Sequence, residues 1–109
     1  MLTEARFIKP AEIEFNEAAD FYDAEQPGLG VSFSECVEAT LLRAMHFPDA
    51  GSPSADPRLR SRVRRFQVDH PFPYDLIVTV LEDEIVVIAV AHHSREPDYW
   101  ISRMKKLRR

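Results

Sequence analysis

Residues 85–103 of the chain are IVVIAVAHHSREPDYWISR, and this stretch decides the fold. Its first seven residues are apolar at every position, whereas a strand with one solvated face alternates apolar and polar side chains. A strand of this kind lies inside a sheet and is covered on both faces. We expect helices to cover one face, and either the C-terminal segment or a second protein to cover the other.

The rest of this stretch leaves the strand through two histidines and Arg95, then restarts as a short helix that carries Tyr99, Trp100 and Arg103. A rigid strand end followed by a loop with a cation, imidazoles and a phenol is a common way to place a functional site. Large aromatic side chains beside arginines are also frequent anchors of protein interfaces. The sequence therefore predicts a functional site at this strand end and leaves both uses open.

Further strands are predicted on the N-terminal side of this one. Residues 62–68 and 74–81 are predicted strands, and Glu82-Asp83 is short enough to be a hairpin turn into the apolar strand. Residues 4–8 are predicted to form a short first strand. Residues 48–57 contain three prolines, one glycine and two serines, which predicts an irregular loop.

Two helices are predicted between the first strand and this loop. The first starts at Pro10, where the missing N–H costs nothing, and ends at Gln26-Pro27-Gly28. The second begins near Val31, because Ser32 and Glu35 have capping-box spacing. A connection of about five residues predicts an antiparallel helix hairpin. The apolar stripes are Ala11, Phe15, Ala18, Ala19 and Tyr22 in the first helix, and Phe33, Val37, Leu41, Ala44 and Met45 in the second.

The order β-α-α-β-β-β, followed by a short C-terminal helix, predicts an α+β fold with a curved, mainly antiparallel sheet. The 109 residues are enough for one domain, spanning residues 1–109. No apolar run approaches the ~20 residues that span a bilayer, and the polar N-terminal segment is no signal peptide. We therefore expect a cytoplasmic protein that does not enter a membrane.

Metal and cofactor sites are not expected. His92-His93 lacks a second pair of ligands at metal-like spacing, and the single Cys36 excludes an internal disulfide. Gly28-Leu29-Gly30 is a lone GxG with no strand before it, which predicts a turn and not a nucleotide-binding loop.

Charge is unevenly distributed along the chain. Residues 1–57 carry 3 basic and 11 acidic side chains, whereas residues 58–109 carry 11 basic and 7 acidic ones, so the two parts differ as −8 and +4. Nine of the eleven cations in the second part are arginines. This asymmetry indicates a basic surface that faces an acidic partner.

A series of short motifs resembles the RelE/ParE family of bacterial type II toxins. In chain order the motifs are PGLG (27–30), F-x-x-x-V (33–37), VRRF (63–66), FPY (72–74), AVAH (89–92) and R-x-P-x-Y-W-x-x-R (95–103). Each is weak alone, but their order and spacing together are fairly specific. The resemblance implies a helix hairpin packed on a curved antiparallel sheet.

The resemblance also implies a function. Members of the family are paired with an antitoxin, whose flexible segment wraps the toxin and blocks it, so we expect a hetero-oligomer with a cognate ParD-like or similar antitoxin. ParE-like members bind DNA gyrase and trap it on cleaved DNA, and RelE-like members cut messenger RNA in the ribosome. We expect the ParE-like activity, with no bond made or broken by the chain, and keep the metal-independent mRNA endonuclease as the alternative.

Metal-free RNA cleavage needs a base, an acid and cations. If the chain is a nuclease, Tyr99 is the candidate base and His92 or His93 the candidate acid. The cations that would lower the pKa of Tyr99 are Arg95, Arg64 and Arg65. RelE-like nucleases tend to carry lysines on the helix-sheet side. Here the three lysines all lie near the chain ends, at Lys9, Lys105 and Lys106. This favours the gyrase-directed activity over the nuclease activity.

The candidate site residues form two sets. Strand alternation predicts that only one of Arg64 and Arg65 faces any given site. Residues predicted to contact the target are Arg64, Arg65, Arg95, Tyr99, Trp100 and Arg103. Residues predicted to contact the antitoxin are Phe15, Tyr22, Phe33, Val86 and Ile88.

Overall fold

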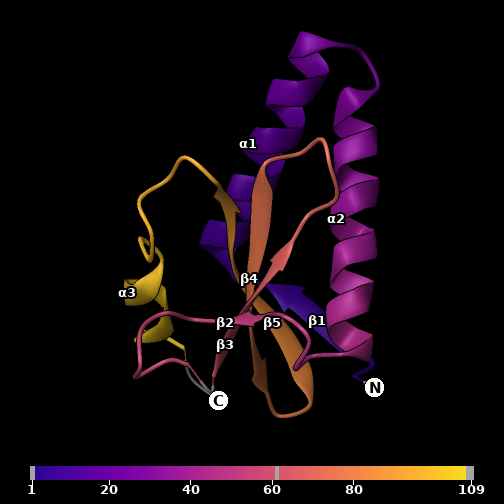
Figure 1. The fold of residues 1–109 in the computed structure, drawn as a ribbon. Coiled ribbons are helices and arrows are strands. Elements are labelled where there is room, and N and C mark those ends of the chain that lie inside the picture. The colour runs from indigo at the N-terminus through magenta and orange to yellow at the C-terminus, as the bar shows by residue number, and fades with distance from the viewer. Residues whose placement is uncertain (1, 61, 108–109) are drawn as a thin grey trace.

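The structure, a computed structural model, describes residues 2–60 and 62–107 (Figure 1). Its elements, in chain order, are β1 (Glu4–Phe7), α1 (Lys9–Glu25), α2 (Leu29–His46), β2 (Ser52–Pro53), β3 (Val63–Gln67), β4 (Tyr74–Leu81), β5 (Glu84–His92) and α3 (Ile101–Met104). This is the predicted α+β order with one addition. The loop predicted to be irregular contributes β2, a two-residue strand paired with Arg64 and Arg65 of β3.

The five strands form one sheet in the order β1-β5-β4-β3-β2. β1 runs parallel to β5, and the other three neighbouring pairs are antiparallel, as predicted for a mainly antiparallel sheet. The apolar strand β5 lies between β1 and β4. Glu82 and Asp83 form the predicted hairpin turn between β4 and β5, with φ angles of 49° and 69°.

β5 sends side chains into two buried clusters, one on each face of the sheet. Ile85 and Val87 pack on the helix side, whereas Val86 and Ile88 pack on the other side. All four are fully buried. The continuous apolar run is therefore explained by a strand that is covered on both faces.

A β-bulge interrupts this alternation. Ile77 of β4 pairs with Ala89, but the next residue, Val78, pairs with Val87, so Ile88 is the extra residue on β5. Ala89 then shares the face of Ile88, and Val90 returns to the helix side.

The chain itself covers the face that the sequence left open. Trp100 and Met104 are buried there, together with Leu59 from the turn before β3. Figure 1 shows α3 on the opposite side of the sheet from α1 and α2. Of the two predicted covers, the C-terminal segment is the one observed.

The helix hairpin is tighter than predicted. α2 begins at Leu29, not near Val31, and its N-cap is Gly28, a left-handed residue with φ of 90° and no side-chain cap. The capping box of Ser32 and Glu35 is therefore wrong, since both residues lie inside the helix. A Cβ on Gly30 would lie 2.6 Å from the carbonyl oxygen of Ala19, so the second glycine lets the two helices meet closely.

Within the described residues, no helix has both the length and the apolar character needed to cross a membrane. No group of three or more His, Cys, Asp or Glu side chains in this part of the chain is placed to hold a metal ion.

Candidate functional site

A cleft of about 340 Å³ lies on the face of the sheet covered by the C-terminal segment. Its walls come from β3, β4 and the end of β5, from residues 53–55, and from the loop of residues 93–100. Residues that the sequence singled out gather in it, namely Arg64, Arg65, His92, Arg95, Tyr99 and Trp100. Arg103 is not among its lining residues.

Arg64 and Arg65 both contribute to the lining of the cleft, but strand alternation in β3 holds. Arg65 shares the face of Val63, on the cleft side, whereas Arg64 shares the face of Phe66, on the helix side, as predicted. Arg65 forms a 3.6 Å ion pair with Asp75. Arg64 donates a hydrogen bond of 3.1 Å to the carbonyl oxygen of Gly51, beside the outer edge of β3. Arg64 also lines a hollow with Val78, whose side chain packs on the helix side of the sheet.

The loop after β5 is held by its histidines. His93 Nε2 lies 3.1 Å from a carboxylate oxygen of Asp75, which also pairs with Arg65. His92 Nδ1 accepts hydrogen bonds from the backbone N–H of Ser94 at 2.9 Å and from its hydroxyl at 2.8 Å. Both imidazoles therefore fix the start of the loop.

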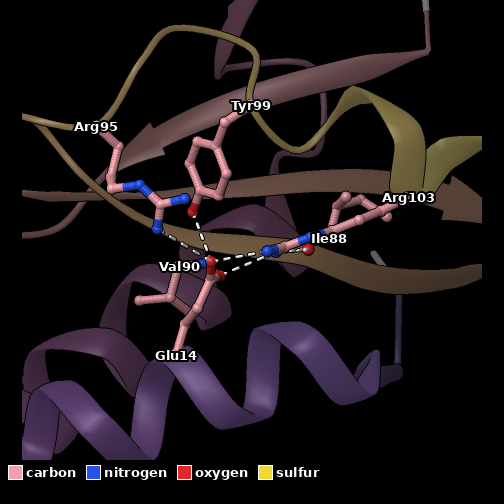
Figure 2. Close-up of polar contacts among 6 residues, drawn as sticks. All are labelled: Glu14, Ile88, Val90, Arg95, Tyr99 and Arg103. Carbon is pink, nitrogen blue, oxygen red and sulfur yellow. Dashed lines mark hydrogen bonds and ion pairs between the residues drawn. The ribbon is translucent and has the colours of Figure 1, made fainter.

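Glu14 of α1 is the centre of the polar contacts behind the cleft (Figure 2). The hydroxyl of Tyr99 donates to its Oε2 at 2.7 Å. Arg103 donates to both carboxylate oxygens, at 3.0 and 2.9 Å. The Glu14 side chain is 15% exposed and that of Arg103 is 19% exposed, so this two-pronged ion pair is largely buried.

The pair also completes the edge of β5. The pairing of β5 with β1 ends at Val87, although β5 continues to His92. Beyond that point the N–H of Val90 donates to Glu14 at 2.9 Å, and the carbonyl oxygen of Ile88 accepts from Arg103 at 3.0 Å. Two side chains thus provide the hydrogen bonds that a further strand residue would provide.

These contacts shift the pKa values of the Glu14 carboxyl and the Tyr99 phenol. Burial, the largest influence, acts to raise the pKa of Glu14, but hydrogen bonds from Arg103, Tyr99 and the Val90 N–H outweigh it and leave the pKa below its ordinary value. Burial, the hydrogen bond to Glu14 and the negative charge of Glu14 raise the pKa of Tyr99, against the weaker effects of Arg103 and Arg95. The Tyr99 phenol is therefore protonated at neutral pH, and its proton is donated to Glu14.

Arg95 presents the accessible cation of this group. Its guanidinium carbon lies 3.8 Å from the centre of the Tyr99 ring, a cation–π contact, and its side chain is 53% exposed. The distance from Arg95 to Glu14 is 3.9 Å, which is longer than the contacts of Arg103. Glu14 thus binds Arg103 fully and leaves Arg95 largely open to solvent.

The residues predicted to contact an antitoxin have different positions. Phe33, Val86 and Ile88 are fully buried and offer no surface to a partner in this structure. Tyr22 is partly buried in an aromatic cluster, with its ring 5.3 Å from that of Phe33 and 5.0 Å from that of Phe72. Phe15 lines an open groove.

This groove lies along α1 and α2 and measures about 660 Å³. Its apolar lining includes Phe7, Phe15, Val31, Val37 and Leu41. Its acidic lining residues are Glu12, Asp23, Glu35 and Glu38. The groove therefore combines an apolar surface with negative charge and contains no basic side chain among its lining residues.

Sequence reasoning missed Glu14 and Asp75, which hold the cleft residues in place. A signal for Glu14 was present, because it lies three residues after Ala11 and four before Ala18, both buried. An acid on the buried face of a helix needs a cationic partner. Nothing in the sequence marks Asp75 as the partner of two cleft residues.

Residues 5–97 match a family model described as the ParE toxin of the type II toxin-antitoxin system parDE. A solved chromosomal ParDE toxin-antitoxin system from P. aeruginosa has a similar fold, with a TM-score of 0.66, 12% sequence identity, and coverage of 84% of this chain and 96% of that chain. No curated protein matches the chain.

Replacing Glu14 by Gln tests the buried ion pair. The variant should lower the free energy of unfolding by about 2 kcal/mol at pH 7, because Arg103 loses a buried charged partner. The lowered pKa of Glu14 means that its charge stabilises the fold above the unfolded value of about 4.5, and that this contribution is lost as the pH falls below it. Urea denaturation at pH 7, 5, 4 and 3 measures the difference between the two proteins.

Glu17→Gln is the matched control, since Glu17 is an exposed residue of the same helix. Its effect should stay within about 0.5 kcal/mol. A Glu14→Gln effect as small as that of the control, or one that does not shrink between pH 5 and pH 3, would contradict the ion pair described above.

Proposed function

The chain belongs to the ParE toxin family of type II toxin-antitoxin systems, and from this premise we propose that it inhibits growth in the cytoplasm by binding DNA gyrase and trapping gyrase on cleaved DNA. The proposed contact surface is the cleft, with the exposed Arg95 and the neighbouring Arg65 as its cations and Arg64 at its border. Tyr99 supports the ring contact of Arg95 and does not act as a base.

The observation that carries this proposal is the Tyr99–Glu14 hydrogen bond of 2.7 Å. A metal-independent nuclease would need a phenol whose pKa is lowered by cations. Here burial and the Glu14 carboxylate raise it instead. This supports a protein that acts by binding and not by catalysis.

The alternative is the ribosome-dependent mRNA endonuclease. The gathering of Arg64, His92, Arg95 and Tyr99 in one cleft favours it, since these are the groups that such an enzyme would use. The two activities make opposite demands on the Tyr99 hydroxyl, and this difference can be measured.

Trp100 and Arg103 take supporting parts in this proposal. Trp100 is buried between the cleft and the sheet, and Arg103 is bound to Glu14 and to Ile88. Both hold the loop of residues 93–100 in position instead of contacting the target.

We also propose that a cognate antitoxin binds the groove along α1 and α2. The groove is apolar, measures about 660 Å³ and is lined by four acidic residues. These features fit an amphipathic segment with lysines or arginines beside its apolar face. Phe15 stays in the predicted contact set, whereas Phe33, Val86 and Ile88 are left out because they are buried.

A gyrase assay with Tyr99→Phe separates the two activities. If the chain acts by binding, the variant should still produce cleaved DNA at concentrations within about threefold of the original protein, because ring and packing remain. A nuclease would instead lose ~10²-fold or more in its rate of mRNA cleavage. Gyrase-dependent DNA cleavage and ribosome-dependent mRNA cleavage are measured with the same protein preparations.

Arg95→Gln and Arg43→Gln form a matched pair for this assay. Arg95→Gln removes a cation of the cleft, so this variant should need about fivefold or more protein for half-maximal formation of cleaved DNA. Arg43→Gln changes an exposed residue of α2 and should have little effect. No cleaved DNA at ~10 μM protein, with mRNA cleavage that depends on the Tyr99 hydroxyl, would refute the gyrase proposal.

The antitoxin groove is tested by reversing two of its charges. Glu35→Lys combined with Glu38→Lys should weaken the complex with the product of the neighbouring reading frame about tenfold or more, because the rim would then repel a basic segment. Isothermal titration calorimetry measures the affinity. Asp20→Lys with Glu25→Lys makes the same charge change on exposed parts of α1 outside the groove. Equal effects of the two pairs would show that the groove is not the binding site.

A further inference from the structure

One charged segment extends beyond the cleft proposed above, which includes only its last two arginines, Arg64 and Arg65. Residues 58–65 are RLRSRVRR, with five arginines among eight residues. Arg58, Arg60 and Arg62 lie in the turns before β3 and Arg64 lies in β3, and we call these four the arginine edge. Ser61 lies outside the described residues.

Buried anchors hold this segment in place. Leu59 and Val63 belong to the same buried cluster as Trp100 and Met104. The backbone N–H of Val63 also donates to the carbonyl oxygen of Leu59 at 2.9 Å. The segment leads into β3, which lies next to the edge strand β2 (Figure 1).

Most of the charge on the arginine edge is uncompensated. Arg58 is paired with Asp56 at 2.8 Å. Among the described residues, Arg60, Arg62 and Arg64 form no ion pair within 4.0 Å, and Arg60 and Arg62 are exposed. Arg62 and Arg64 line one hollow of about 220 Å³, where Asp49 is the acid among the lining residues.

The chemistry of the arginine edge fits phosphate groups. Guanidinium groups bind phosphate oxygens through paired hydrogen bonds and keep their charge at any physiological pH. Proteins that grip single strands usually provide aromatic side chains on which bases stack, and residues 58–65 contain no aromatic residue. A duplex needs no such platform.

We propose that the arginine edge binds the phosphodiester backbone of duplex DNA directly, without reading its sequence and without gyrase. Residues 58–109 carry a net charge of +4 and residues 1–57 a net charge of −8, so DNA is attracted to the part of the chain that contains the arginine edge and repelled by the other part. The contact is mainly electrostatic, and its affinity falls steeply with salt.

The test uses the chain alone, with neither gyrase nor antitoxin present, so its outcome does not depend on the gyrase proposal. Fluorescence anisotropy is measured with labelled 25-base-pair DNA, the matching single strand and duplex RNA of the same length, from 50 to 200 mM salt. Duplex DNA should bind most tightly. Arg60→Gln with Arg62→Gln should weaken binding about fivefold or more at 50 mM salt and reduce the slope of log K against log salt by about 2.

Lys9→Gln with Arg43→Gln removes the same charge from exposed residues of α1 and α2, far from this segment in the sequence, and should change the affinity less than about twofold. Three results would overturn the proposal. They are no binding of duplex DNA at ~50 μM protein in 50 mM salt, equal losses in the two double variants, and tighter binding of single-stranded DNA or duplex RNA than of duplex DNA.

Discussion

The rest of this structure depends on the hydrogen bonds and the ion pair of the Glu14 carboxylate, which is largely buried between α1 and β5. It accepts hydrogen bonds from the backbone N–H of Val90 in β5, from the hydroxyl of Tyr99 and from Arg103. The carboxylate therefore joins the first helix to the sheet and to the C-terminal segment. Burying a carboxylate is costly unless it is paired and fully hydrogen-bonded. The bidentate contact with Arg103 meets that condition and explains why these two residues, 89 positions apart, are held together.

This arrangement determines which groups of the cleft are free to act. Arg103 and the Tyr99 hydroxyl are engaged with Glu14, whereas the guanidinium of Arg95 remains largely exposed above the Tyr99 ring. Charges of opposite sign lie on different surfaces of the molecule. An acidic groove lies along the helix hairpin, and exposed arginines lie in the cleft and beside β3. Each surface suits a partner of the opposite sign.

The sequence predicted the fold well, because its signals were local. The apolar run of residues 85–91, the helical stripes and the Glu82-Asp83 turn each specify one element, and the elements were found in the predicted order. The start of α2 was missed because the positive φ of Gly28 outweighs a capping-box pattern that begins four residues further on. The cleft residues were identified as a group, yet their roles were not, since these depend on Glu14 and Asp75. Contacts across 85 residues of chain, such as that of Tyr99 with Glu14, leave no trace in spacing or periodicity.

Hydrogen exchange at one backbone amide tests the central interaction most directly. The N–H of Val90 has a side-chain acceptor, Glu14, whereas the N–H of Ile8 bonds to the Val87 carbonyl oxygen on the neighbouring part of β5. If the Glu14 carboxylate truly closes this edge, NMR-detected exchange should show Val90 protected to within about tenfold of Ile8. Exchange of the Val90 amide at the rate of an unstructured peptide, with Ile8 still protected, would contradict the account.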